Sequence, residues 1–211
     1  MNAGHKRLKL LLLTLAILAC SVVALGGTLA SNDSINTMDY KVSLLCYNPA
    51  TNQYDLPVYG ENAYHPYTAD VLWCPGYTKI VYLKIVNEEE FPVESELDII
   101  FESNGFGKML SYAVIYGLQP NTQNHPENWA EFKDRANISG VLEKNALLAP
   151  NRSSYKVAKL AQLDPDEKGA RYYALAIHMD EKTPNEYQGQ SMDLNFYLRV
   201  NAKYETGFDP N

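Results

Sequence analysis

The chain has 211 residues, of which 46% are hydrophobic and 20% are charged, and its formal net charge is −7. Three of its 18 basic residues and none of its 25 acidic residues lie in residues 1–30, so the rest of the chain carries a formal charge of −10. A domain this acidic repels nucleic acid and anionic membranes. We therefore exclude nucleic acid as a partner.

The first thirty residues have the pattern of a signal peptide. A basic head precedes an uncharged stretch over 10–32, and small residues two apart, Thr28 and Ala30, mark a cleavage site between Ala30 and Ser31. We expect a secreted protein that works outside the cell and meets the membrane only during export. No nucleotide pool is available there, which excludes most intracellular enzyme classes.

Two alternatives for this segment stay open. An apolar run of about 20 residues is long enough to remain as a membrane anchor. A lipoprotein site at Cys20 is the other alternative. The helix-poor pair Gly26-Gly27 favours cleavage over an anchor, and the apolar residues at 22–25 are atypical after a lipidated cysteine.

Short strands with turn signals between them recur along residues 31–211, which we expect to form a single domain. Pro75-Gly76 predicts a type II turn, and the strand after it is apolar on both faces and therefore central. The two C-terminal strands alternate between apolar and polar residues, and their polar connection at 181–189 predicts an antiparallel pair. In chain order, we predict strands at 41–47, 77–87, 96–102, 109–118, 154–160, 172–179 and 192–203. The fold class is mainly β, an antiparallel β-sandwich.

One segment of the domain, residues 121–150, differs from the strands and predicts a small helical insert. Pro126 suits the first helical position, and Trp129, Phe132 and Ala136 are spaced to share one face of a helix. A second apolar stretch at 141–149 is expected to add a further helical turn or two.

Two cysteines, Cys46 and Cys74, follow the signal peptide. An even pair in an exported chain predicts one disulfide, whose loop closure stabilises a fold by about 3–4 kcal/mol. The alternative is two free thiols, because a domain of this size folds without a disulfide.

Few residues suggest a chemical site, and no sequence resembles a zinc helix or a nucleophile elbow. His178 and Asp180, close to acidic residues of the connection that follows, are weak candidates for a metal site. The simpler interpretation is a solvent-facing histidine on a strand. Tyr172 and Tyr197 lie on polar strand faces, where aromatic rings stack on sugars or on another subunit. We expect no catalytic residue and no cofactor.

The signal and the middle of the chain resemble one family. Residues 1–30 resemble the signals that a dedicated SipW-type signal peptidase of Gram-positive bacteria reads. Pro75-Gly76 precedes a strand that ends at Asn87 and is followed by Pro-Val at 92–93. This arrangement is similar to the strand-turn-strand core of the TasA and camelysin family.

The C-terminal part carries the same resemblance. His178, the Asn-Glu-Tyr-Gln-Gly sequence at 185–189 and the alternating strand at 194–202 resemble that family's C-terminal hairpin. Together with the signal, the resemblance covers about 71–118 and 171–204.

The resemblance implies a jelly-roll-like β-sandwich that is exported as a subunit of a biofilm matrix. Members similar to TasA assemble into extracellular fibres, in which an N-terminal strand of one subunit completes a sheet of the next. The donor strand implied here is residues 31–40, with Ser31, Ile35, Met38 and Tyr40 as assembly residues. The implied partners are other copies of the chain, the dedicated signal peptidase and other matrix components.

Two other functions remain open at this stage. The camelysin branch implies a secreted metallopeptidase, for which His178 with its acidic neighbours is the weak candidate site. The exposed tyrosines suggest a carbohydrate-binding sandwich at the cell surface.

Overall fold

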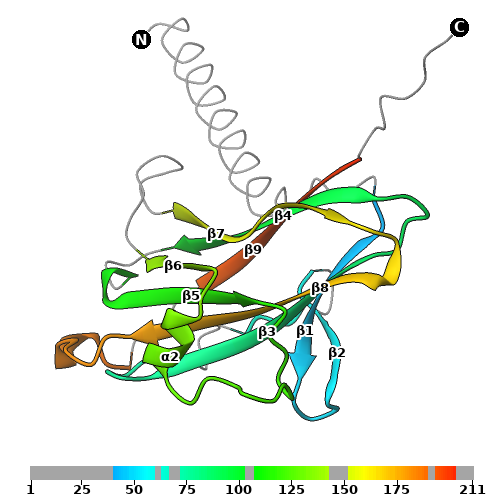
Figure 1. Ribbon diagram of the computed structural model, residues 1–211. Coiled ribbons are helices and arrows are strands. Elements are labelled where there is room, and N and C mark those ends of the chain that lie inside the picture. Colours follow the sequence, from blue (N-terminus) through cyan, green and yellow to red (C-terminus); the bar gives the residue numbers. More distant parts are fainter. Residues whose placement is uncertain are drawn as a thin grey trace, which may run out of the picture. The chain divides into compact units, whose positions relative to one another are not determined.

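β-Strands make up most of the described part of the chain. The computed structural model describes residues 40–59, 63–66, 72–102, 107–142, 152–189 and 193–202, all within the unit Thr37–Asn211 (Figure 1). The elements are β1 (Val42–Asn48), β2 (Gln53–Pro57), β3 (Thr78–Asn87), β4 (Val93–Glu102), η1 (Gly107–Met109), β5 (Leu110–Tyr116), α2 (Trp129–Asp134), β6 (Ile138–Val141), β7 (Arg152–Leu163), β8 (Asp166–Met179), η2 (Asn185–Tyr187) and β9 (Asp193–Ala202).

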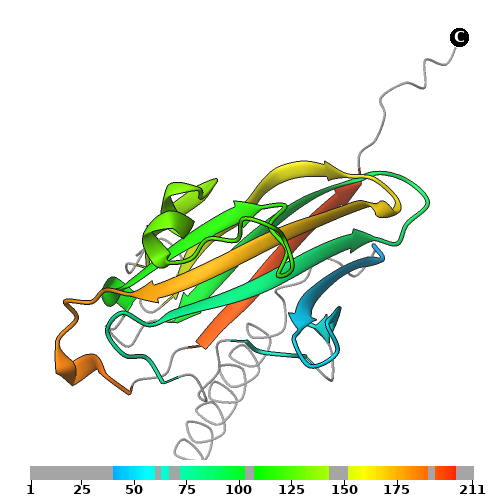
Figure 2. The same ribbon diagram turned by 60° about the horizontal axis from the view of Figure 1, so that its bottom comes forward.

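The strands form two antiparallel sheets that pack as a sandwich, which confirms the predicted fold class. One sheet has six strands in the order β2-β1-β3-β8-β5-β6, and the other has three in the order β7-β4-β9. Figures 1 and 2 show the two layers, with β3 and β8 central in one and β4 central in the other. The central position predicted for the strand after Pro75-Gly76 is therefore confirmed.

The last two strands, β8 and β9, belong to different sheets, which corrects the predicted C-terminal pair. β8 pairs with β3 and β5, whereas β9 pairs with β4 in the other sheet. The alternation of apolar and polar residues shows that each strand buries one face, and this pattern does not specify which strand lies beside it. The connection after β8 crosses from one sheet to the other instead of closing a hairpin.

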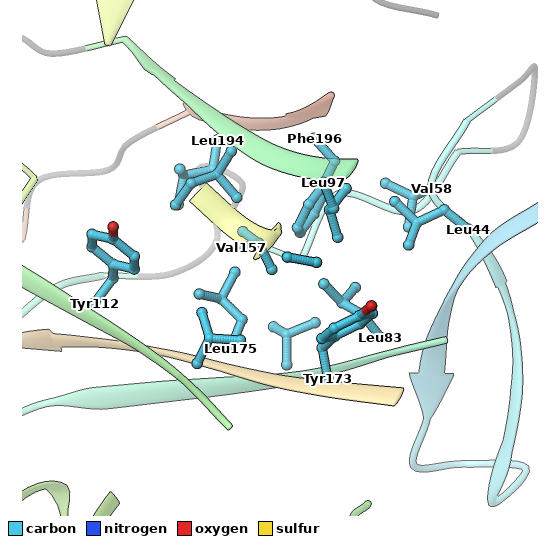
Figure 3. Close-up of a cluster of buried hydrophobic side chains, with 14 of the residues drawn as sticks. Leu44, Val58, Leu83, Leu97, Tyr112, Val157, Tyr173, Leu175, Leu194 and Phe196 are labelled. Atoms are coloured by element: carbon cyan, nitrogen blue, oxygen red, sulfur yellow. The ribbon is translucent and has the colours of Figure 1, made fainter. Parts of the chain in front are cut away.

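The core lies between the two sheets. Inward-facing side chains of the six-stranded sheet, such as Leu83 and Leu175, face Leu97 and Phe196 of the three-stranded sheet (Figure 3). Each of these residues alternates along its strand with a residue on the outer face, as the period of two requires.

The predicted helical insert is smaller than expected. The helix α2 begins after Asn128, whose side chain accepts a hydrogen bond from the Glu131 N–H at 3.0 Å, so Pro126 lies before the helix. Residues 138–141, expected to lie in the insert, form strand β6 on β5, because an edge of the sheet was open to them. Residues 143–150 lie outside the described residues. Phe132 is buried, and Trp129 and Ala136 pack against the same cluster, as their spacing predicted.

Helix α2 covers the outer face of the six-stranded sheet. Phe132 packs on Ala113 and Ile115 of β5 and on two small residues of β8, Ala174 and Ala176. Small side chains on the sheet let the helix approach closely. Figure 2 shows α2 beside β5 and β8, on the side turned away from β4.

Candidate functional site

Three segments that are far apart in the sequence meet at one end of the six-stranded sheet. The Tyr77 N–H donates to the Cys74 carbonyl at 2.9 Å, and Gly76 has φ of +80°, which confirms the predicted type II turn. The Gly76 N–H donates to the Met179 carbonyl, and the Gly189 N–H donates to the Trp73 carbonyl, both at 2.9 Å. The Pro-Gly turn, the end of β8 and the 185–189 loop therefore form one structural unit.

His178 lies on the outer face of this unit, under the helix. It is only 3% exposed, and its ring stacks on the Trp129 indole with a centroid distance of 4.7 Å and an interplanar angle of 12°. Its Nδ1 lies 2.9 Å from the hydroxyl of Thr78, its register partner on β3. The predicted solvent-facing histidine is therefore wrong, because Trp129 covers the ring.

The charge state of His178 follows from this burial. Burial lowers the pKa of His178, against the opposing influence of Glu181, whose Oε1 lies 3.5 Å from Nε2. Glu181 is well exposed, so water screens this pair. The imidazole is neutral at pH 7, and it can accept or donate one hydrogen bond on each side.

A pocket of about 390 Å³ opens beside this stack. Its lining combines aromatic and apolar side chains with two carboxylates, those of Glu127 and Glu181. The volume lies within the range of small-molecule sites, and an apolar lining with a few polar groups is typical of them. We refer to it as the Trp129–His178 pocket.

The weak metal candidates do not form a ligand set. The Asp180 carboxylate accepts the Lys182 N–H at 2.7 Å and closes a turn, and His178 Nδ1 lies at the Thr78 hydroxyl. Across the described ranges, the structure has no group of three or more histidine, cysteine or acidic side chains that could hold a metal ion.

The two cysteines occupy different environments. Cys46 is fully buried on the inner face of β1, and burial raises the pKa of its thiol to about 12. Cys74 is exposed in the turn before β3. Both are free thiols in the structure, and the disulfide between them stays a prediction.

Thiol counting tests this pairing. For a chain that begins at Ser31, we expect Ellman's reagent to titrate Cys74 at once and Cys46 only after denaturation, because a buried thiol with a raised pKa forms little thiolate. If the denatured, unreduced chain contains no reactive thiol, the two cysteines are joined.

The tyrosines on the outer face of the six-stranded sheet form a cluster that the sequence did not predict. Tyr47, Tyr54 and Tyr172 lie on β1, β2 and β8, and Tyr82 on β3 contacts both Tyr47 and His125. Their rings meet edge to face, at interplanar angles from 61° to 81°. A flat platform for stacking sugars needs coplanar rings, so this geometry favours packing between the tyrosines.

A charge network lies on the outer face of the three-stranded sheet. Asp98 of β4, only 5% exposed, contacts Lys156 of β7 at 3.0 Å and Arg199 of β9 at 2.9 Å. Glu96 pairs with the same two cations. The network joins all three strands, and it shows that Tyr197, which lies under Arg199, faces a charged surface.

The residues at the N-terminal end are described in part. Ala30, Ser31, Ile35 and Met38 lie outside the described residues. Tyr40 is described, and its ring contacts Phe91 edge to face with a centroid distance of 6.4 Å.

Comparisons with known proteins were made at three levels. No family model, curated protein or solved structure matches the chain. The resemblance to the TasA and camelysin family therefore rests on the sequence segments given above. Within the part of the chain that the structure describes, no helix has the length and apolar character needed to cross a bilayer.

Proposed function

We propose that the chain is a secreted structural subunit that assembles into fibres of an extracellular biofilm matrix. The observation that carries this proposal is strand β9, an edge strand with a regular register. All ten of its residues pair in sequence with β4, from Glu102↔Asp193 to Val93↔Ala202. Among the described strands, β9 pairs only with β4, and we assign its second edge the role of a template for another strand.

The opposite edge of the same sheet is less suited to this role. β7 also pairs only with β4 among the described strands, but its register shifts twice between Ser95 and Asp98. Such irregularities bend an edge and protect it from further pairing. We therefore assign the acceptor role to β9.

The chain before β1 leaves the domain near the end of this edge. Tyr40 contacts Phe91, and the Lys41 carbonyl accepts a hydrogen bond from the Glu88 N–H at 2.7 Å. Phe91 lies two residues before Val93, which pairs with the last residue of β9. Residues 31–39 precede this anchor and are one residue shorter than β9, which supports their role as a strand donated to a neighbouring copy.

A tyrosine from the other sheet covers the middle of the acceptor edge. The hydroxyl of Tyr59, after β2, lies beside the backbone of Leu198 in β9. An incoming strand that pairs along the whole of β9 displaces this contact. Because main-chain hydrogen bonds along ten residues replace one side-chain contact, the exchange favours the added strand.

Electron microscopy of the chain that begins at Ser31 tests the proposed function. We expect filaments at high protein concentration, because each copy offers one donor segment and one acceptor edge, and a head-to-tail contact that does not close into a ring extends into a filament. Sedimentation that shows only monomer over the same concentration range would contradict the proposal.

A further inference from the structure

The Trp129–His178 pocket lies on the six-stranded sheet, whereas the proposed acceptor edge belongs to the three-stranded sheet. It is built from three stretches of the chain that meet there: the turn before β3 with the start of that strand, α2 with the loop before it, and the end of β8 with the connection that follows. Because these segments are far apart in sequence, the pocket belongs to the folded domain and not to a single loop. What it binds is independent of the assembly proposal.

The polar groups of the pocket favour a cation. Glu127 and Glu181 supply two carboxylates, and the lining includes no lysine or arginine. The remainder of the chain after residue 30 carries a formal charge of −10, so the surrounding field also attracts cations. An anionic ligand would meet two carboxylates, and no cationic side chain of the lining opposes them.

The apolar part of the lining favours an organic cation over a metal ion. Tyr77 and Trp129 offer aromatic rings, which attract ammonium groups through their π faces, and Ile80 offers surface for an alkyl chain. A hard metal ion prefers several oxygen ligands. The described residues hold no such group of three.

We propose that the Trp129–His178 pocket binds a primary alkylammonium group, with the ammonium at Glu181 and Glu127 and the alkyl chain against the aromatic lining. Lysine side chains of proteins and free diamines both present this chemistry. His178 stays neutral in the complex and holds Trp129 in place through the ring stack.

Acid is expected to weaken this binding. The charged groups that face His178 are Glu181, Asp180 and Lys133, from its own connection and from α2. When His178 gains a proton, it becomes a cation beside Glu181 and competes with the ligand for that carboxylate. Because burial lowers the pKa of His178, we expect the affinity to fall only as the pH is lowered through that pKa, below the ordinary range of a histidine.

The test uses nuclear magnetic resonance on the chain that begins at Ser31, with Nα-acetyl-lysine methylamide and 1,5-diaminopentane as separate probes. We expect either probe to shift the indole N–H signal of Trp129 with saturation and to leave that of Trp73, which is buried elsewhere, unchanged. Saturation by both probes assigns the pocket to lysine side chains as well as free amines, and saturation by the diamine alone assigns it to free amines. Nε-acetylated lysine, which has lost its charge, is expected not to bind.

Matched variants separate the pocket from general attraction to an acidic protein. We expect Glu181→Gln to weaken binding at least about fivefold, the effect of losing one charge-assisted contact. Glu181 is well exposed, so this variant keeps the fold. Glu186→Gln removes the same charge from an exposed position of the same connection and is expected to change the affinity less than twofold. Equal loss in the two variants, or no saturable binding of either amine, would overturn the proposal.

Discussion

A chain that begins at Tyr40 is expected to stay monomeric under conditions in which the chain that begins at Ser31 forms filaments. The deletion removes residues 31–39, nine of the ten residues implied as the donor strand, and keeps Tyr40, which anchors the chain to its own domain. Tyr40 retains its contact with Phe91, and the Lys41 N–H still donates to the Glu89 carboxylate at 2.6 Å. The loss of assembly is expected to be complete, because each contact along the fibre needs one donor.

The control keeps the length and composition of the segment and changes its order. A chain with residues 31–39 scrambled tests whether the side-chain pattern matters or whether any extended segment suffices. Light scattering and electron microscopy measure assembly in all three chains, and far-ultraviolet circular dichroism confirms that each is folded. Filaments formed by the chain that begins at Tyr40 would contradict the donor role.

Replacement of Trp73 by alanine is expected to lower the free energy of unfolding by about 3–5 kcal/mol, the usual cost of truncating a buried aromatic residue. Trp73 is 1% exposed and the largest of the fully buried side chains among the described residues. Its ring meets Tyr77 with a centroid distance of 5.4 Å, and its carbonyl accepts the Gly189 N–H. The residue thus joins the Pro-Gly turn to the loop after β8. A cavity in place of its side chain removes packing contacts from both segments.

The neighbouring residue provides the control for this substitution. Leu72 is 65% exposed, so Leu72→Ala is expected to change the free energy of unfolding by less than about 0.5 kcal/mol. Urea unfolding followed by circular dichroism measures both variants without relying on tryptophan fluorescence. A Trp73→Ala variant as stable as Leu72→Ala would show that this end of the sheet contributes little to the fold.

The strands other than β2 and β6 were predicted from the sequence, most of them because their side chains alternate. Leu97 and Ile99 are buried and Glu96 lies on the outer face, as the period of two in the sequence indicates. The partner of each strand was not predictable from this pattern. β8 and β9 follow each other along the chain, and each pairs in a different sheet, because the pairing depends on how the two layers close.

The candidate site could be predicted only in fragments. Pro75-Gly76 indicated its turn, and His178 was singled out by its acidic neighbours. Trp129 was predicted on a buried helical face, but nothing in the sequence placed it on His178, because the two residues approach only when α2 docks on β8. The ion network of Asp98 with Lys156 and Arg199 was not predictable either, because its residues lie on three strands that meet only in the folded sheet.

Disulfide trapping between two copies of the chain tests the central claim most directly. One copy carries a cysteine in the donor segment at Ile35, and the other carries Asn195→Cys or Asn201→Cys, at exposed positions on the outer face of β9. Cys74→Ser in both copies removes the exposed native thiol. Gln53→Cys, exposed on the edge strand β2 of the other sheet, is the control acceptor.

Mixed and assembled under oxidising conditions, the two copies are expected to form covalent dimers through β9 and not through β2. The position that gives more dimer, 195 or 201, then reports the register of the donor. Filaments whose copies become linked through Gln53→Cys and at neither position of β9 would contradict the assignment of β9 as the acceptor edge.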